Sequence, residues 1–575
     1  MEVIANLFSS IQSAFIDESE ISFELIKKIR TLAENLGEPF INFGKHIPVI
    51  NENISQNEDI EQVKDIGNIL FQEKRYLESC EAFTRLIYQS SLCGEIKGFW
   101  NRSASLEKLN KYHECLDNLD ASIRYESEFV PAHQLYDRRG RCFLKLEMKD
   151  TALENFRIAK EHLEKSDIPE KIKSLFLNHL RKSEVEAKSL KNTKYFEREC
   201  EENNLSSKVE TKFSKSLGRY LVAKENFKPG EIILTQSPIS MYGNKKGFCH
   251  HCLKEVGIAP FPSLFIESLE FCSYFCFSYA HQQYHSYESR LLLNNGNKEL
   301  EIPANVLLAI RIISKLKESI LDDNMKDICD DYAIMNGLVS HERGHDRGEV
   351  ITTAIRSVII GKILLEADFY GDRIINETHL IKIDKFIHFL QLALPHNIHS
   401  IYQLNGDKRD DIVLDKIGRG IYECALYLNH SCCANTLRFN NGNQLVLISN
   451  RSIKKGDIIS DCYGSHHFTS PKNNRRMNLM AEYKFECNCV ACKNNYPSIK
   501  DLMKQEPSLM SKENKNIQKI FKKYQEQYTF QNYRKAISYC QKYIEELEKI
   551  KKYPHPNYEI GAVALKSCFW NLYHN

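Results

Sequence analysis

The sequence has no hydrophobic run long enough to cross a bilayer. The nearest candidate, residues 351–365, contains Arg356 and Lys362, whereas a transmembrane helix needs about 20 mostly apolar residues. The first residues, MEVIANLFSS, place no basic segment ahead of an apolar core, so no secretory signal peptide is visible. We therefore expect a protein that does not bind membranes and that resides in the cytoplasm, the nucleus or both.

An excess of charge of one sign is also missing. Lys and Arg together number 78 and Asp and Glu 76, which gives a net charge of +2. Nucleic-acid-binding proteins usually present a strongly basic face, so we expect no direct contact with nucleic acid. The hydrophobic fraction of 42% and the charged fraction of 27% exclude wholesale disorder. The 575 residues correspond to roughly three to five domains.

Cysteine, in contrast, is abundant, with 19 residues. In a reducing compartment this number indicates metal ligands and buried thiols rather than disulfides. Two groups stand out: Cys249, Cys252, Cys272 and Cys276, and then Cys487, Cys489 and Cys492. Two close cysteine pairs can hold one tetrahedral zinc ion through four thiolates. The spacing therefore predicts a structural zinc site in the first group.

A helical pattern repeats in the N-terminal third of the chain. Small residues at Gly67, Ser103 and Gly140 are each followed at fixed distances by a compact residue and then by a bulky one. Small residues let two helices approach, and bulky ones fill the layer between neighbouring hairpins. The period is slightly above that of a tetratricopeptide repeat (TPR). The pattern resembles three TPRs, with an unrelated helical bundle as the alternative.

A TPR array forms a concave groove that normally binds a partner. Some TPR domains hold the C-terminal tail of heat-shock chaperones in a two-carboxylate clamp. By resemblance to that pattern, the clamp positions are occupied by Lys64, Asn68, Asn101, Gln134 and Arg138. Polar side chains on one face can bind a terminal carboxylate, although Gln134 stands where lysine is usual. The alternative is a set of solvated groove residues.

Later segments alternate like short strands joined by turns. KSLGRYLVAKENFKPGEIIL contains a Lys-Pro-Gly turn, and the run Asn429-His430-Ser431-Cys432 precedes a strand that ends at Tyr463. Together with the cysteine tail, these motifs resemble a SET-domain methyltransferase. The first cysteine group and the YAHQQYHSYES that follows it resemble a MYND zinc finger. The combination is similar to the TPR-bearing branch of the SET-and-MYND-domain family.

The resemblance implies an S-adenosylmethionine-dependent protein-lysine N-methyltransferase that acts on a protein substrate. It implies that Tyr463 is the catalytic tyrosine and that Tyr483 lines the lysine channel. The implied cofactor-binding residues are Gly218, Arg219, His341, Asn429, His430, Tyr463 and Phe485. The resemblance also adds Cys432 to the tail cysteines as a fourth zinc ligand, so that about two structural zinc ions are expected in total.

The sequence departs from the family at two places. Ser263, Ile266 and Ser289 stand where the second MYND zinc site has cysteines, and only His285 remains. Tyr220 replaces a glycine of the cofactor-binding turn, where glycine permits close backbone approach. These departures support an alternative function, a weak or inactive SET-fold scaffold or chaperone-linked adaptor that acts through its TPR groove.

The predicted fold is a monomeric α+β multidomain protein. The expected parts are an N-terminal helical segment (1–60), a TPR array (61–165), a helical linker (166–210), N-terminal SET strands (211–245), a MYND-like finger with a degenerate second zinc site (246–290), a helical SET insert (291–415), the SET catalytic core (416–470), a post-SET zinc segment (471–500) and a helical, TPR-like C-terminal segment (501–575). The resemblance implies that this last lobe is short, which would leave the substrate cleft more open.

Overall fold

The structure is a computed structural model. It describes residues 30–31, 60–89, 92–124, 130–190, 204–266, 268–292, 302–316, 338, 345–367, 369–371, 375–405, 413–505, 515–550 and 553–574. The chain forms two compact units, and both are discontinuous in sequence. The array unit comprises His46–Glu199 and Asn244–Leu300, and the sheet unit comprises Met1–Lys45, Cys200–Gly243 and Glu301–Asn575.

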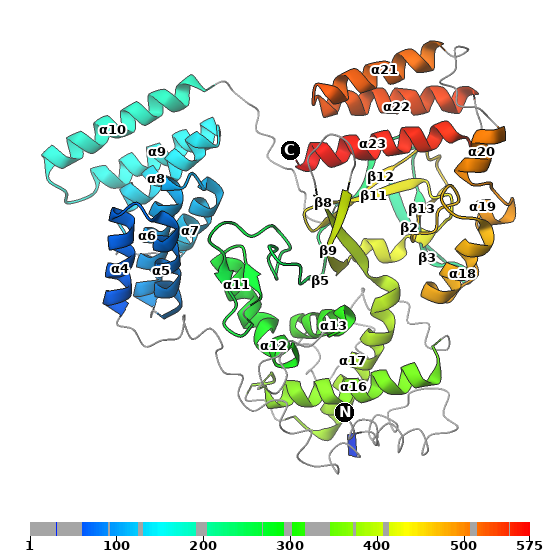
Figure 1. Ribbon diagram of the computed structural model, residues 1–575, viewed down its shortest axis with the longest axis horizontal. Coiled ribbons are helices and arrows are strands. Elements are labelled where there is room, and N and C mark those ends of the chain that lie inside the picture. Colours follow the sequence, from blue (N-terminus) through cyan, green and yellow to red (C-terminus); the bar gives the residue numbers. More distant parts are fainter. Residues whose placement is uncertain are drawn as a thin grey trace. The chain divides into compact units, whose positions relative to one another are not determined.

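Helical hairpins build most of the array unit (Figure 1). The helices are α4 (Ile60–Gln72), α5 (Tyr76–Gln89), α6 (Leu92–Lys108), α7 (Tyr112–Arg124), α8 (Ala132–Lys145), α9 (Lys149–Glu164) and α10 (Glu170–Ser189). The repeated small residues have a steric cause, because a Cβ on Gly67 would lie 2.5 Å from the ring of Phe83, and one on Gly140 would lie 2.5 Å from the ring of Phe156. Each glycine therefore lets the two helices of its hairpin close.

The cysteine-rich segment of the array unit folds into a small finger. Its elements are β6 (Phe261–Pro262), β7 (Glu270–Phe271), α11 (Tyr274–Ala280), the π-helical turn η2 (His281–His285) and α12 (Ser286–Leu292). The Ser273 hydroxyl caps α11 by accepting the backbone N–H of Cys276 at 3.2 Å. This cap satisfies an otherwise unpaired donor in the first turn of the helix.

The finger and the helices share one hydrophobic core. Phe99 of α6 packs edge-on against Tyr274, with ring centres 4.7 Å apart, and the Tyr88 hydroxyl donates to the Pro262 carbonyl at 2.8 Å. Arg102 is fully buried between them and lies 4.1 Å from the ring centre of Phe261. The array helices and the finger, which residues 200–243 separate in the sequence, therefore belong to one compact unit.

Three small sheets form the centre of the sheet unit. Their strands are β1 (Asn204–Leu205), β2 (Val209–Ser214), β3 (Gly218–Ala223), β4 (Ile232–Gln236), β5 (Ser240–Tyr242), β8 (His399–Asn405), β9 (Val413–Ile421), β10 (Asn429–His430), β11 (Thr436–Asn441), β12 (Gln444–Ser449) and β13 (Ile458–Asp461). The strand orders are β1-β4-β12-β11, β10-β13-β3-β2 and β5-β9-β8. The parallel pair β10–β13 brings residue 430 opposite residue 461, which positions the candidate site.

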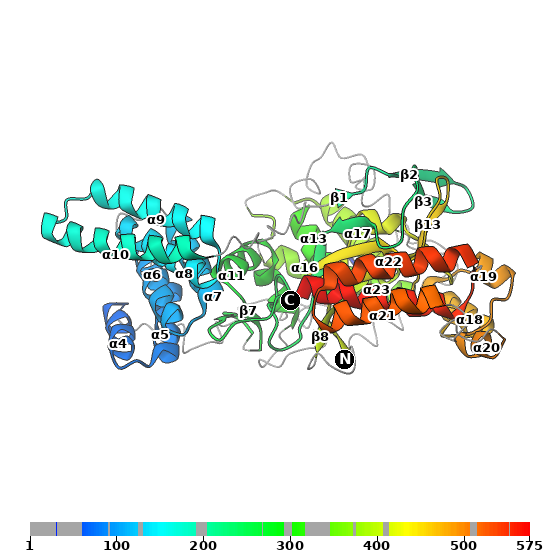
Figure 2. The same cartoon turned by 90° about the horizontal axis from the view of Figure 1, so that it is seen from above.

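Helices surround these sheets. They are α13 (Ala304–Lys315), α16 (Arg347–Glu366), α17 (Glu377–Asn397), α18 (Lys472–Tyr483), α19 (Val490–Lys493), α20 (Ile499–Gln505), α21 (Lys515–Thr529), α22 (Tyr533–Ile550) and α23 (Pro556–His574), with the short 3-10 turn η5 at Cys424–Tyr427. Figure 2 shows α21, α22 and α23 running side by side. Phe439 of β11 packs against Phe569 and Trp570 of α23. None of the helices in the described ranges is both long and apolar enough for a membrane span.

Candidate active site and metal centres

The Asn429-His430-Ser431-Cys432 run and Tyr463 lie together in the sheet unit. The β10–β13 pairing is extended by a hydrogen bond from the Ser431 N–H to the Asp461 carbonyl, at 2.9 Å. The Tyr463 N–H donates to His430 Nδ1 at 3.0 Å. The Tyr463 hydroxyl donates to the Leu428 carbonyl at 2.6 Å. Two segments predicted to act together are therefore joined by direct hydrogen bonds.

Aromatic rings form a wall around Tyr463. The ring centres of Tyr463 and Tyr483 are 4.8 Å apart, and His430 lies 5.2 Å from Tyr463 and 6.1 Å from Phe485. Burial raises the pKa of the Tyr463 phenol well above its usual value, so this hydroxyl stays protonated. Burial lowers the pKa of His430 to about 4, which keeps its ring neutral and able to accept the Tyr463 N–H.

Two cavities meet near this wall. A small one of about 30 Å³ is lined by Tyr463, Tyr483, His396 and Arg438, among others. A larger one of about 230 Å³ also has Arg438 in its wall, together with Lys566 of α23. Arg438 is held by Asp461 at 2.7 Å. Arg438 therefore borders both cavities.

The predicted cofactor-binding residues of β3 and β10 also approach one another. The Asn429 amide donates to the Leu217 carbonyl at 3.0 Å, next to Gly218 at the start of β3. Gly218 has a φ of +65°, a backbone conformation that favours glycine. Arg219 lies 5.8 Å from the ring of Tyr427. The Asn429 side chain and the start of β3 are therefore neighbours, whereas His341 lies outside the described residues.

The tail cysteines and Cys432 form a compact cluster. The sulfur atoms of Cys432, Cys487, Cys489 and Cys492 all lie within 4.8 Å of one another. Cys432 is 3.9 Å from Cys487 and 3.7 Å from Cys492, and sulfur ligands of one tetrahedral zinc ion are about 3.8 Å apart. The Arg475 guanidinium lies 3.7 Å from the Cys492 sulfur, where it would offset thiolate charge. The donor set fits a structural zinc ion.

The finger contains a second cluster of the same kind. The sulfur atoms of Cys249, Cys252, Cys272 and Cys276 lie within 4.8 Å of one another. Cys252 is 3.4 Å from Cys272, and Cys272 is 3.6 Å from Cys276. The segment between them contains little secondary structure, and a closed zinc site can supply folding energy to such a segment. This donor set also fits zinc.

Beside this cluster, the position of the degenerate second site is filled by hydrogen bonds. The Ser263 hydroxyl lies 2.7 Å from His285 Nε2, and His285 Nδ1 lies 3.0 Å from Glu288 Oε1. His250 Nε2 lies 2.6 Å from the same carboxylate oxygen. Nitrogen and oxygen ligands of one tetrahedral zinc ion would be about 3.3 Å apart. The shorter distances indicate a proton-bridged network.

Glu288 is a residue that the sequence analysis missed. Its side chain is completely buried, and it lies three residues after His285 on the same helical segment, a spacing that places both on one face. A buried carboxylate needs hydrogen-bond donors, and the two histidines supply them. An acidic residue three positions after His285 was the feature of the sequence from which this hydrogen bond could have been predicted.

The predicted clamp residues occupy the first helix of each hairpin. Lys64 and Asn68 lie on α4, Asn101 on α6, and Gln134 and Arg138 on α8. Lys64 forms an ion pair with Glu61, the two asparagines are half-buried, and Gln134 is exposed. Of the five, only Asn101 and Arg138 stand at equivalent repeat positions, each two residues before the small residue of its hairpin.

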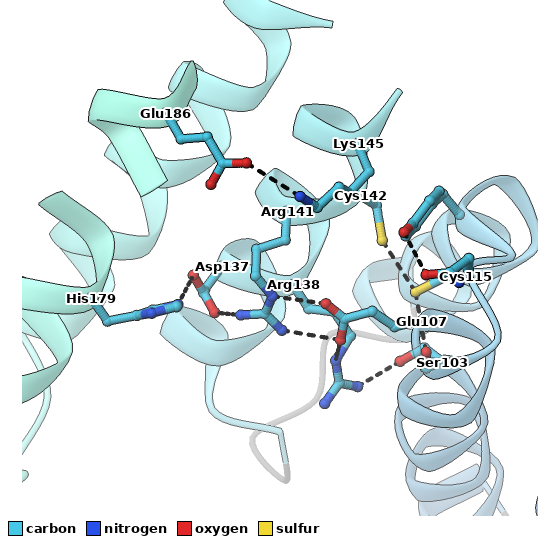
Figure 3. A network of polar contacts seen from close by, with 12 residues as sticks. Ser103, Glu107, Cys115, Asp137, Arg138, Arg141, Cys142, Lys145, His179 and Glu186 are labelled. Carbon is cyan, nitrogen blue, oxygen red and sulfur yellow. Dashed lines mark hydrogen bonds and ion pairs between the residues drawn. The ribbon is translucent and has the colours of Figure 1, made fainter. Parts of the chain in front are cut away.

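Arg138, however, is already bound within the array. Its guanidinium stacks 3.6 Å from the ring centre of Trp100 and donates to the Trp100 carbonyl at 2.9 Å and to the Ser103 hydroxyl at 2.7 Å. Figure 3 shows Arg138 beside Glu107 and Arg141, and Arg141 reaches Glu107 at 2.8 Å. Binding of a carboxylate by Arg138 would have to replace these contacts.

Comparison with known proteins agrees with this arrangement. A family model of the SET domain matches residues 218–464. The protein-lysine N-methyltransferase SMYD4 of Pongo abelii is 22% identical over 540 residues, which cover 75% of this chain and 66% of that protein. The chain therefore contains a region that matches the SET domain and is similar along most of its length to proteins of the SET-and-MYND-domain family. It spans just under two thirds of this relative's length.

Two further relatives support the same placement. Human SMYD4, also named a protein-lysine N-methyltransferase, is 23% identical over 543 residues, or 75% of this chain and 66% of that protein. Mouse SMYD3, named a histone-lysine N-methyltransferase, is 29% identical over 131 residues, or 23% of this chain and 29% of that protein.

Proposed function

We propose that the protein is an S-adenosylmethionine-dependent protein-lysine N-methyltransferase. The observation that carries the proposal is the placement of the Tyr463 hydroxyl, 2.6 Å from the Leu428 carbonyl and beside Tyr483, in the region that matches the SET domain. The names of the relatives support the same reaction. The scaffold alternative would keep this fold without methyl transfer.

The chemistry requires alignment more than acid–base groups. S-adenosylmethionine, when bound, supplies an activated methyl group for in-line displacement by a lysine amine. The Tyr463 O–H donates to Leu428, so its oxygen remains able to accept an N–H of the amine and to direct the nitrogen lone pair. The ring of Tyr483 narrows the channel and excludes water, which favours the neutral amine.

We propose that the cofactor binds to residues of β10 and of the start of β3, which the hydrogen bond from Asn429 to Leu217 brings together. Asn429, His430 and the Gly218 backbone would hold the polar parts of the cofactor, and Phe485 would pack against its adenine ring. The larger cavity, whose wall contains Arg438 and Lys566, would accept substrate residues next to the target lysine. In this role Arg438 would separate those residues from the channel.

Substitution of Tyr463 tests the proposal. In the zinc-loaded full chain, Tyr463→Phe should lower transfer of labelled methyl groups to an array of lysine-containing peptides by at least about 100-fold. Calorimetric titration with S-adenosylmethionine should show unchanged binding, because the phenol contacts the amine. Tyr528→Phe removes another hydrogen-bonded hydroxyl and should leave transfer unchanged. Equal activity in Tyr463→Phe, or no cofactor binding by the folded wild type, would refute the proposal.

We further propose that the three helical hairpins are TPRs whose first helices bind a partner, with a chaperone tail as the specific candidate. The placement of Lys64, Asn68 and Asn101 on the first helices of their hairpins supports this groove. Asn101→Ala is a sharper test than Arg138→Ala, because Arg138 also contributes to packing. Asn101→Ala should weaken binding of a Glu-Glu-Val-Asp peptide by about tenfold, and equal affinity would exclude the clamp.

A further inference from the structure

Two histidines face each other at the edge of the candidate site. His345 directly precedes α16, and only 2% of its side chain is exposed. His396 lies in the last turn of α17. Their Nε2 atoms are 3.3 Å apart. Because His396 also lines the small cavity with Tyr463 and Tyr483, the pair adjoins the aromatic wall.

The other ring nitrogens are bound to oxygen acceptors. His396 Nδ1 lies 2.7 Å from the Glu482 carbonyl, which can only accept, so this nitrogen carries the hydrogen. His345 Nδ1 lies 2.9 Å from Glu349 Oε2, and an ionised carboxylate also only accepts. In the neutral form of each ring, Nε2 therefore presents a lone pair. Two lone pairs at 3.3 Å repel each other unless a cation lies between them.

The geometry of the rings matches a shared metal ion. Two imidazole nitrogens bound to one tetrahedral zinc ion are about 3.3 Å apart, and the centres of their rings are about 5.2 Å apart. The observed distance between the ring centres is 5.2 Å. If both rings pointed straight at each other along the line that joins the two Nε2 atoms, a nitrogen separation of 3.3 Å would place the ring centres about 5.6 Å apart. The rings are therefore inclined to that line, as convergence on one ion requires.

We propose that His345 and His396 bind a divalent transition-metal ion, such as Zn²⁺ or Ni²⁺, through their Nε2 atoms. Imidazole ligands suit these ions, and water would complete the coordination. The Glu349 carboxylate and the Glu482 carbonyl then act as the outer-sphere acceptors that orient metal-bound histidines. Because Glu482 precedes Tyr483, the ion would fix the position of the channel wall. The site does not depend on methyl transfer.

Titration of the zinc-loaded full chain with Ni²⁺ tests the proposal. Calorimetry should show one site outside the two cysteine clusters, weakened at least tenfold in His345→Gln and in His396→Gln. Glu349→Gln keeps both ligands and removes only the orienting carboxylate, so it should weaken binding by up to about tenfold. His113→Gln, which removes an exposed histidine of α7, should bind Ni²⁺ as the wild type does.

Zinc content provides the check on folding. All variants should retain the zinc held by the cysteine clusters, and Glu349→Gln decides the result if a histidine variant misfolds. The absence of Ni²⁺ binding by the wild type would overturn the proposal and would assign a shared proton to the pair. Equal binding by the wild type, both histidine variants and Glu349→Gln would overturn it as well.

Discussion

The finger contains two neighbouring clusters of side chains that could bind a metal ion, and they differ in their donor atoms. In one, four cysteine sulfurs are separated by distances such as 3.4 and 3.6 Å, which leave room for a zinc ion at their centre. In the other, His250 Nε2 and His285 Nδ1 lie 2.6 and 3.0 Å from the same Glu288 oxygen, which are hydrogen-bond distances rather than separations of ligands on one zinc ion. The distance between the ligand atoms therefore distinguishes a cluster that fits a metal ion from a cluster that is held by hydrogen bonds.

The hydrogen-bonded cluster of His250, His285 and Glu288 also connects separate segments of the finger, but it does so through hydrogen bonds instead of metal–ligand bonds. A metal ion bonds each ligand to a common centre, whereas here the Glu288 carboxylate accepts from both histidines. The Ser263 hydroxyl extends the network, since it also accepts the N–H groups of Phe265 and Ile266, at 3.1 and 3.2 Å. The carboxylate of Glu288 and the protons that it shares with the histidines thus connect these segments of the finger.

The largest expected effect comes from breaking the thiolate cluster. Cys249→Ser should lower the zinc content from about two ions per chain to about one and destabilise the array unit by several kcal/mol, because a structural zinc ion contributes folding free energy directly. Metal analysis and urea unfolding measure both effects. Cys424→Ser, at a half-buried thiol outside both clusters, is the control. Full zinc retention in Cys249→Ser would contradict the assignment.

Breaking the hydrogen-bonded cluster should cost less. Glu288→Leu removes the acceptor shared by His250 and His285 and leaves buried donors unsatisfied, which should lower the free energy of unfolding by about 3 kcal/mol. Zinc content should stay at about two ions per chain. A wild-type content of three ions that falls to two in Glu288→Leu would show that this cluster also binds metal.

The smallest expected effect is a change in the pH dependence of the stability of the finger. Burial lowers the pKa of His281 in the finger below its usual value of 6.5, so the folded state binds this proton less readily than the unfolded state does. The resulting stability is fully present above about pH 6.5 and is lost as the pH falls toward the folded-state pKa. His281→Gln should flatten the pH dependence of urea unfolding in this range. An unchanged slope would exclude His281 as a contributor.

Features that depend on local spacing were predictable from the sequence. The repeated small residues anticipated the close approach of Gly67 to Phe83, and the cysteine spacing anticipated the sulfur cluster of the finger, whereas Cys432 was added to the tail cysteines by the resemblance to a SET domain. The Asn429-His430 motif and Tyr463 were expected together, and the β10–β13 pairing brings them together. In each case, a few residues at short, fixed spacings in the sequence were enough to predict the structural feature.

Features that depend on distant partners were not predictable. In the core shared by the array and the finger, Arg102 packs against the ring of Phe261. No periodicity in either segment predicts that contact. Arg138 matched a clamp position, yet its guanidinium is stacked on Trp100. Likewise, the facing of His345 and His396 results from the arrangement of α16 and α17 in space.

The joining of the helical array to the finger has a consequence for biosynthesis. Arg102 leaves the ribosome long before Phe261, its aromatic partner, and at about 5–20 residues per second the delay is on the order of ten seconds or more. During that interval Phe99 and Tyr88 have no finger to cover them, while the first strands of the other unit are being made. The nascent chain therefore exposes an apolar surface at Phe99 and Tyr88, to which chaperones can bind until the finger has folded with its zinc ion and covers these side chains.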